Sequence, residues 1–232
     1  MKGGFVIALV VFSLTAFGQD RIIDPTRVYA NSNGILYELK PRPTNPTAKY
    51  FYISDFFKTG DIYLRTGQKL SNVPIRYDIM RNRMEISFED ELKVLYASKI
   101  DSFTWFNPGG TGKSKFVRCK RFKDIDEDMK GFLQVIAEGP LTLGSYTYLK
   151  VYPATSSVSL SGSHRDHNIF KKEDFFVIAG DELDDFPKKR KEALTLMADH
   201  RDAVKRYMRQ HGLIFSRKDD LIKIVRYYNT LN

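Results

Sequence analysis

The chain has a single cysteine, Cys119, among its 232 residues, so it cannot form an internal disulfide bond. Without a disulfide, the fold must be stabilised by its hydrophobic core. The segment 116–122 has the pattern of a strand, which predicts that Cys119 is a packed structural thiol. A catalytic thiolate, the alternative, would need a histidine and an orienting group nearby, and no local pattern supplies them.

An apolar run long enough to cross a membrane is lacking at the N-terminus. Residues 1–18 contain a basic start at Lys2, an apolar stretch over 5–12, and small residues at the last and third-last positions. This is the organisation of a secretory signal peptide, with cleavage expected before Gln19. The apolar stretch is well short of the roughly 20 residues that a spanning helix needs. No cysteine follows the cleavage point, so we expect an exported protein, periplasmic or extracellular, that is not a lipoprotein and keeps no transmembrane span.

Histidine and tryptophan are scarce, with four and one residues, whereas the chain has 17 phenylalanines and 13 tyrosines. Abundant aromatic residues are typical of β-strands. His164 and His167 form the one close pair of histidines, and with Asp166 they are a conceivable zinc site. Their spacing fits no standard helical pair, and the adjacent serines and glycine predict a loop. We therefore expect no metal and no cofactor.

Negative charge is in deficit. The formal net charge of +9 falls by one, to +8, when Lys2 is removed with the signal peptide. A positive surface attracts anionic neighbours, which outside the cytoplasm are envelope polymers rather than nucleic acid. Many of the basic residues lie between Lys188 and Lys218, where we expect them to form the solvent-exposed face of helices; binding to an anionic surface is the alternative.

Recognisable catalytic motifs are lacking as well. Residues 108–114 resemble a phosphate-binding loop, but Asn107 stands where the motif requires its first glycine, and a strand rather than a helix follows. Residues 124–128 lack the glycine of a calcium loop, and no G-x-S-x-G nucleophile motif occurs. These absences predict a non-enzymatic binding or structural module of the cell envelope. The alternative is an exported hydrolase whose catalytic residues are dispersed in the sequence.

What the sequence does contain is a long stretch of period-two alternation between Phe56 and Phe106. Apolar side chains alternate with polar ones over 73–79 and again over 84–88, as in strands with one buried face. The link between these segments is short and contains Asn82, a residue that tolerates tight turns, so the two should pair as a hairpin. A second hairpin is predicted around Gly139, between 132–138 and 145–152.

The pattern becomes helical after Pro187. We predict helices over 188–197 and 201–211, the second ending at Gly212, and a third helix after an N-cap at Ser216. The third carries apolar residues at helical spacing and should pack on the rest of the protein; these residues are Leu221, Ile224, Val225 and Tyr228.

Together these patterns predict an α+β fold. An antiparallel curled β-sheet of roughly seven to ten strands, a sandwich or half-barrel, is followed by three C-terminal α-helices. We expect a signal peptide over 1–18, an irregular N-terminal segment over 19–49, an antiparallel β domain over 50–182, and a C-terminal helical subdomain over 183–232 packed on the sheet.

The order of aromatic, glycine and strand residues carries a family resemblance. The run Tyr52–Ile62, then Gly67, then Ile75–Asp78 resembles an uncharacterised family of exported β-rich proteins of Bacteroidota with no assigned function. The likeness extends over about half of the mature chain and rests on turn and packing residues. It implies export and a β-rich fold, and it assigns no site.

The predicted binding surface lies on the second hairpin. Tyr146, Tyr148, Lys150 and Tyr152 share one face of a strand, and the smaller Thr147, Leu149 and Val151 share the other. If the aliphatic face is buried, three tyrosines and a lysine face the solvent, where tyrosine is well suited to contact a partner. The partner is expected to be an envelope protein or an anionic envelope polymer. The alternative is that the tyrosines cover the sheet beneath the C-terminal helices.

Overall fold

The computed structural model describes residues 21–23, 37–38, 51–88, 91–107, 109, 112–152 and 168–231. The predicted signal peptide and the pair His164 and His167 lie outside these residues. Among the helices of the described part, none has the length and apolar character needed to cross a bilayer.

Ten strands form one antiparallel sheet that does not close on itself, in the order β12-β11-β10-β9-β8-β7-β3-β4-β5-β6. A short β2 pairs with β6 at one end of the sheet, and β1 pairs in parallel with β4. The strands are β1 (Arg21–Ile23), β2 (Tyr37–Glu38), β3 (Lys58–Leu64), β4 (Gln68–Asp78), β5 (Arg83–Phe88), β6 (Glu91–Tyr96), β7 (Ile100–Phe106), β8 (Lys113–Arg118), β9 (Phe132–Ala137), β10 (Thr142–Tyr152), β11 (Asn168–Ala179) and β12 (Glu182–Asp185).

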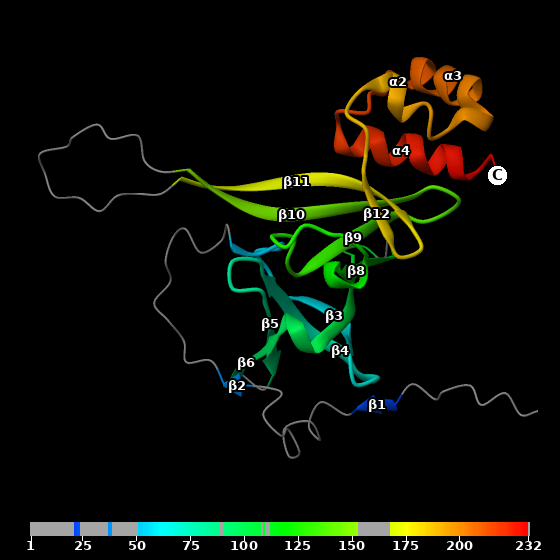
Figure 1. The fold of residues 1–232 in the computed structure, drawn as a ribbon. Helices are drawn as coiled ribbons and strands as arrows, with labels where there is room; N and C mark the ends of the chain where they lie inside the picture. Colours follow the sequence, from blue (N-terminus) through cyan, green and yellow to red (C-terminus); the bar gives the residue numbers. More distant parts are fainter. Residues whose placement is uncertain are drawn as a thin grey trace, which may run out of the picture.

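Three α-helices follow the sheet and lie over one end of it (Figure 1). They are α2 (Arg190–Ala193), α3 (Arg201–His211) and α4 (Lys218–Asn229), and three short 3-10 turns complete the fold: η2 (Ala97–Lys99), η4 (Cys119–Arg121) and η5 (Ala198–His200). The predicted α+β class, with a curled antiparallel sheet and C-terminal helices, is confirmed.

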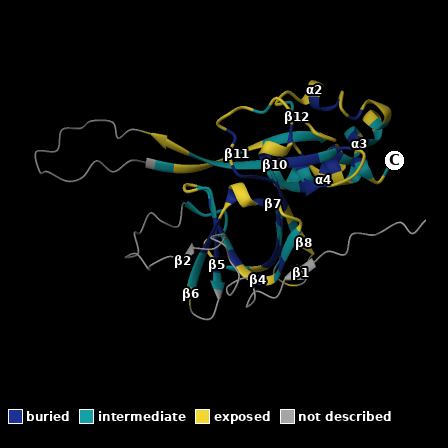
Figure 2. Ribbon diagram, turned by 60° about the horizontal axis from the view of Figure 1, so that its bottom comes forward, coloured by how far each residue is buried: buried dark blue, intermediate teal, exposed yellow. Residues whose placement is uncertain are grey.

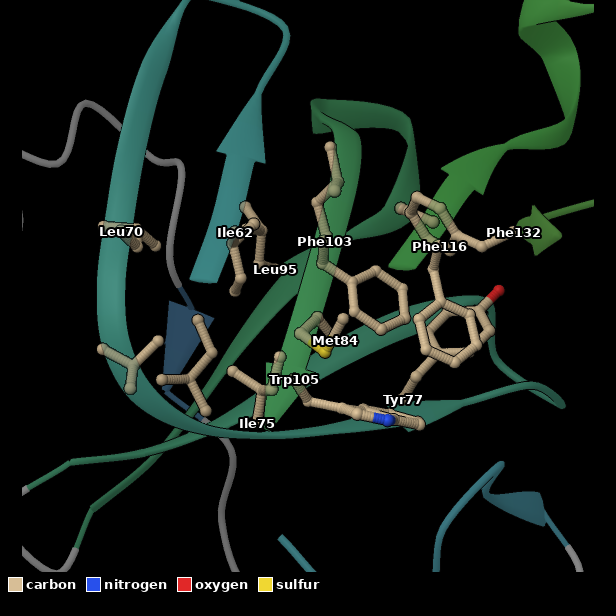
Figure 3. Close-up of a cluster of buried hydrophobic side chains, with 14 of the residues drawn as sticks. Ile62, Leu70, Ile75, Tyr77, Met84, Leu95, Phe103, Trp105, Phe116 and Phe132 are labelled. Atoms are coloured by element: carbon tan, nitrogen blue, oxygen red, sulfur yellow. The ribbon is translucent and has the colours of Figure 1, made fainter. Parts of the chain in front are cut away.

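The first half of the sheet curls because of one short connection. The turn η2 joins β6 to β7, yet β3, β4 and β5 lie between those two strands in the sheet. A link of three residues can join them only if the sheet bends so that their ends meet. The result is a half-barrel whose inside holds an apolar cluster centred on Phe103, which is fully buried (Figure 3). Its ring stacks on Phe116 at 4.4 Å and meets Phe132 edge-on at 5.0 Å.

The hairpin predicted around residue 82 is the β4–β5 hairpin, with Tyr77 opposite Met84. Asn82 supplies the positive φ of 49° that the turn needs. Beside the turn lies a buried charge network. The carboxylates of Asp78 and Glu85 are almost completely buried, and they pair with three arginines of the same hairpin: Arg76, Arg81 and Arg83.

The second half of the sheet is covered by the helices on one face. Leu143 of β10 and Ile136 of β9 lie in a second apolar cluster with the stripe of α4, and all four stripe residues are buried as predicted. The helix predicted over 188–197 is wrong in extent, since only Arg190–Ala193 is α-helical and turns follow it. Arg217, not Ser216, is the N-cap of α4, and it makes no side-chain capping bond.

The opposite face of the second half carries a third apolar cluster that contains Cys119 and Leu133, both fully buried. The chain leaves β8 just before Cys119, which lies in η4 and not in a strand as predicted. Its backbone N–H donates to the Gly131 carbonyl at 2.9 Å, which holds the turn in place. Burial raises the pKa of the Cys119 thiol to about 12, as expected for a packed, unreactive thiol.

Candidate functional site

The strand β9 connects the two apolar clusters on the concave face of the sheet, and a polar residue stands between them. Phe132 belongs to the half-barrel cluster and Ile136 to the cluster beneath the helices. Side chains alternate along a strand, so Gln134 shares their face. The neighbouring strands contribute polar groups to the same face, because Gln134 lies opposite Ser145. We call this set the polar belt: Ser114, Gln134, Ser145, Thr147 and Glu173.

Two cavities open along the polar belt. One, of about 390 Å³, lies between the half-barrel and β11, and the other, of about 330 Å³, lies between β8, β9 and α4. They share the lining residues Ser114, Gln134 and Lys218 and so adjoin as the two halves of one groove. Its basic lining residues, which give it the name basic groove, are Lys58, Lys113, Lys115, Lys171, Lys172, Lys218 and Arg226; its acidic ones are Glu138 and Glu173.

Lys218 and Glu173 connect α4 to the sheet at the middle of the groove. The Lys218 ammonium lies 2.5 Å from Oε1 of Glu173, and the Ser145 hydroxyl donates to the same carboxylate oxygen. Ser145 is only 1% exposed, so a substrate carbonyl has no route to its oxygen. The three residues therefore form a positioning contact between two layers of the fold, not a nucleophile with its base.

The remaining cations are paired to different degrees. Lys171 and Lys113 lie 3.6 Å from Asp55 and Asp61, carboxylates outside the groove lining, and Lys115 pairs with Glu138 at 2.7 Å. Such partly exposed pairs are weak. Within the described residues three lining cations, Lys58, Lys172 and Arg226, have no carboxylate partner.

Lys58 and Lys172 line one half of the groove, and Arg226 lines the other. Lys58 lies over the Trp105 ring, 4.9 Å from its centre. Arg226 donates to the Ile136 carbonyl at 3.3 Å. Each half therefore holds a positive charge that no protein carboxylate neutralises, so the groove carries a net positive potential.

Asp61 lies at the edge of the groove, where its carboxylate faces Lys113 at 3.6 Å. Burial acts to raise the pKa of the Asp61 carboxyl, since it disfavours the charged form. Three groups outweigh this effect by stabilising the charged carboxylate. The Asn72 backbone N–H donates to it at 3.0 Å, and the ammonium groups of Lys69 and Lys113 lie 3.3 Å and 3.6 Å away. The pKa of Asp61 is therefore below its usual value.

Gln134 is the neutral centre of the groove. It lies where the two cavities meet, and its side-chain amide has no hydrogen-bond partner within the described part of the chain. An amide offers both donors and an acceptor. The centre of the basic groove can therefore bind a polar, uncharged group while the cations around it attract negative charge.

The predicted surface of Tyr146, Tyr148, Lys150 and Tyr152 lies on the opposite face of the sheet from the helices, because Leu143 faces the helices and side chains alternate. Tyr146 packs against the cluster that contains Cys119, and its hydroxyl bonds to the backbone N–H and carbonyl of Lys130, each at 3.0 Å. Burial raises the pKa of Tyr146 to about 12. Its role is structural.

The other three residues of that surface are progressively more exposed along the long β10–β11 ribbon, which extends past the rest of the sheet (Figure 1 and Figure 2). The Tyr148 ring stacks on the Tyr146 ring with 5.8 Å between their centres. Burial, and to a lesser extent a hydrogen bond to Asp174, raises the pKa of Tyr148. Lys150 lies 5.4 Å from the Tyr152 ring. The structure thus brings these residues together as one row, but no cavity among those described opens beside them.

Sequence reasoning missed the basic groove. Gln134 and Glu173 look like ordinary outward-facing residues of alternating strands, and Lys218 was counted with the exposed helical charges. One signal was present: Gln134 interrupts the apolar run Phe132–Ala137 of a strand buried on both faces. A polar residue in such a strand is expected to have a partner or a ligand.

Neither half of the groove is lined by a histidine or by Cys119. In the described part of the chain no three histidine, cysteine or acidic side chains come together in a way that would hold a metal ion. Comparison with protein-family models, curated proteins and solved structures finds no match to this chain, and inference about function therefore starts from the chemistry of the groove.

Proposed function

We propose that the chain is an exported, non-enzymatic binding module of the cell envelope whose basic groove binds an anionic envelope polymer. The observation that carries the proposal is that each half of one groove holds a cation without a carboxylate partner, Lys58 in one half and Arg226 in the other. Each half has the volume of a typical ligand site, for which about 300–1,000 Å³ is usual.

A polymer suits this groove better than a small ligand. The two cavities share the lining residues Ser114, Gln134 and Lys218, and their cations come from β3, β8, β11 and α4, so one extended chain can contact cations of both halves. A small anion would contact one half only. Long-range attraction between the positive groove and a polyanion also increases the rate of encounter at low salt.

The test is the affinity of fluorescently labelled dextran sulfate, a generic polyanion, measured by anisotropy at fixed salt. The variant is Lys58→Glu with Arg226→Glu. Each charge reversal removes an attraction and adds a repulsion, and these two effects together weaken binding by about 1 kcal/mol per substitution. The double variant should therefore bind about 30-fold more weakly.

The matched control is Lys99→Glu with Lys120→Glu, two exposed lysines of η2 and η4 that line neither half of the groove. It makes the same change in net charge and should alter the affinity by less than about twofold, given the screening of distant surface charges. Equal losses in both variants would mean that binding follows net charge and not the groove. Export is tested separately, by N-terminal sequencing of the protein recovered outside the cytoplasm, which should begin at Gln19.

A further inference from the structure

We propose that the polymer is an acidic polysaccharide, and that Gln134 and Glu173 of the polar belt select it over other polyanions by contacting sugar hydroxyls. This inference rests on the proposed function and concerns the same groove. Its starting point is that the groove presents hydrogen-bond acceptors as well as cations. Glu173 contributes a carboxylate at the floor, and Gln134 contributes an amide with no partner in the described chain.

The acceptors decide which anion fits. A polyphosphate chain carries acceptor oxygens only, and it would place them against the Glu173 carboxylate and the amide oxygen of Gln134. A polysaccharide carries hydroxyl groups, which donate as well as accept. Its hydroxyls can donate to Gln134 and Glu173 while its acidic groups lie near the lysines. The Glu173 carboxylate keeps Ser145 and Lys218 as its own donors, so what it adds against a polyphosphate is the repulsion between its negative charge and the closely spaced phosphate oxygens. A polysaccharide avoids that repulsion by placing a hydroxyl group there.

The lysines explain why the polymer must be charged. Neutral sugars are usually held by stacking on an exposed aromatic ring. The one tryptophan beside the groove, Trp105, is only 3% exposed, and Lys58 lies over it. Lysine ammonium groups act as compact point charges with no fixed geometry, which suits acidic groups spaced along a flexible polymer.

The experiment compares three labelled probes at the same salt concentration: an oligogalacturonate, a polyphosphate with the same number of charges, and neutral dextran. Charge density alone would favour the polyphosphate. The proposal predicts the reverse order, with the oligogalacturonate bound about tenfold more tightly and dextran not bound.

The decisive variant is Gln134→Leu, with Gln210→Leu on the exposed face of α3 as its control. Loss of the amide should weaken oligogalacturonate binding about three- to tenfold and polyphosphate binding clearly less, because phosphate oxygens can use only the amide's N–H donors. Thr147→Val, at the half-buried edge of the same cavity, gives a second test if Gln134→Leu does not fold, and melting curves of each variant establish that it does.

The outcomes separate this inference from the proposed function. If polyphosphate binds as tightly as oligogalacturonate, or if Gln134→Leu weakens both probes equally or neither, the polysaccharide inference is overturned. The proposed function still holds in that case if the variant with Lys58→Glu and Arg226→Glu loses polyanion binding. If neither polyanion binds, both are overturned.

Discussion

Replacing Glu85 by alanine should be among the most destabilising single changes in the β-sheet. Its side chain is 1% exposed and accepts hydrogen bonds from Arg76 at 2.8 Å, Arg83 at 3.0 Å and the Tyr52 hydroxyl at 3.2 Å. The alanine variant leaves two guanidinium groups in a half-buried site without this carboxylate. Breaking a buried pair in this way typically costs about 3–5 kcal/mol.

For a protein of this size each kcal/mol lowers the melting temperature by about 2–4 °C. Thermal unfolding followed by circular dichroism should therefore show a decrease of roughly 6–20 °C for Glu85→Ala. The control is Glu91→Ala on the adjacent strand β6, where the carboxylate is 57% exposed and pairs with Lys93. An exposed pair is worth about 0–1 kcal/mol, so the control should melt within a few degrees of wild type. A Glu85→Ala variant that melts no lower than the control would refute the reasoning.

Three further predictions follow from individual side chains. Because the pKa of Asp61 is lowered in the folded state, its stabilising contribution is complete above the unfolded pKa of about 3.9 and is lost as the pH falls through the folded pKa. Urea unfolding from pH 6 to pH 2 should therefore show a smaller acid-induced loss of stability in Asp61→Asn than in wild type. Identical pH profiles of the two proteins would contradict this. Because burial raises the pKa of Cys119 to about 12, Ellman's reagent at pH 8 should label the thiol only in denaturant, whereas rapid labelling of the native protein would show that the thiol is accessible. Tyr146→Ser should destabilise by about 2–4 kcal/mol, somewhat below the range for losing a fully buried aromatic side chain because Tyr146 is half-buried. Tyr148→Ser should destabilise by less than about 1 kcal/mol. Calorimetry of the two variants decides, and the reverse ranking would mean that the packing described for Tyr146 is wrong.

Local signals in the sequence predicted the parts of the fold that depend on neighbouring residues. The β4–β5 hairpin follows from period-two alternation and a turn at Asn82, and the buried face of α4 follows from apolar residues at helical spacing. The end of α3 at Gly212 was predicted because glycine commonly ends helices, and in the structure Gly212 has the left-handed φ of 63°. Each of these features is determined within about a dozen residues of chain.

The remaining features depend on pairing between distant segments. The strand β7 pairs with β3, about 40 residues earlier in the chain, and no local pattern specifies that choice. The basic groove depends on the same long-range pairing, since Gln134, Glu173 and Lys218 come together only once β9, β10, β11 and α4 are in place. The alternation of the tyrosines was visible in the sequence, but it could not reveal which face the helices cover.

Lysine footprinting tests the central claim most directly, because it reports where on the surface a polyanion binds. The protein is acetylated briefly with and without saturating oligogalacturonate, and with dextran sulfate in parallel, and modification of each lysine is measured by mass spectrometry. Lys58, Lys171 and Lys218 of the basic groove should be protected several-fold. Lys99 and Lys120, which lie outside it, and Lys150 on the tyrosine row should be modified at the same rate as in the free protein. Protection of Lys150 with no protection of Lys58 and Lys218 would contradict the account and place binding on the opposite face of the sheet.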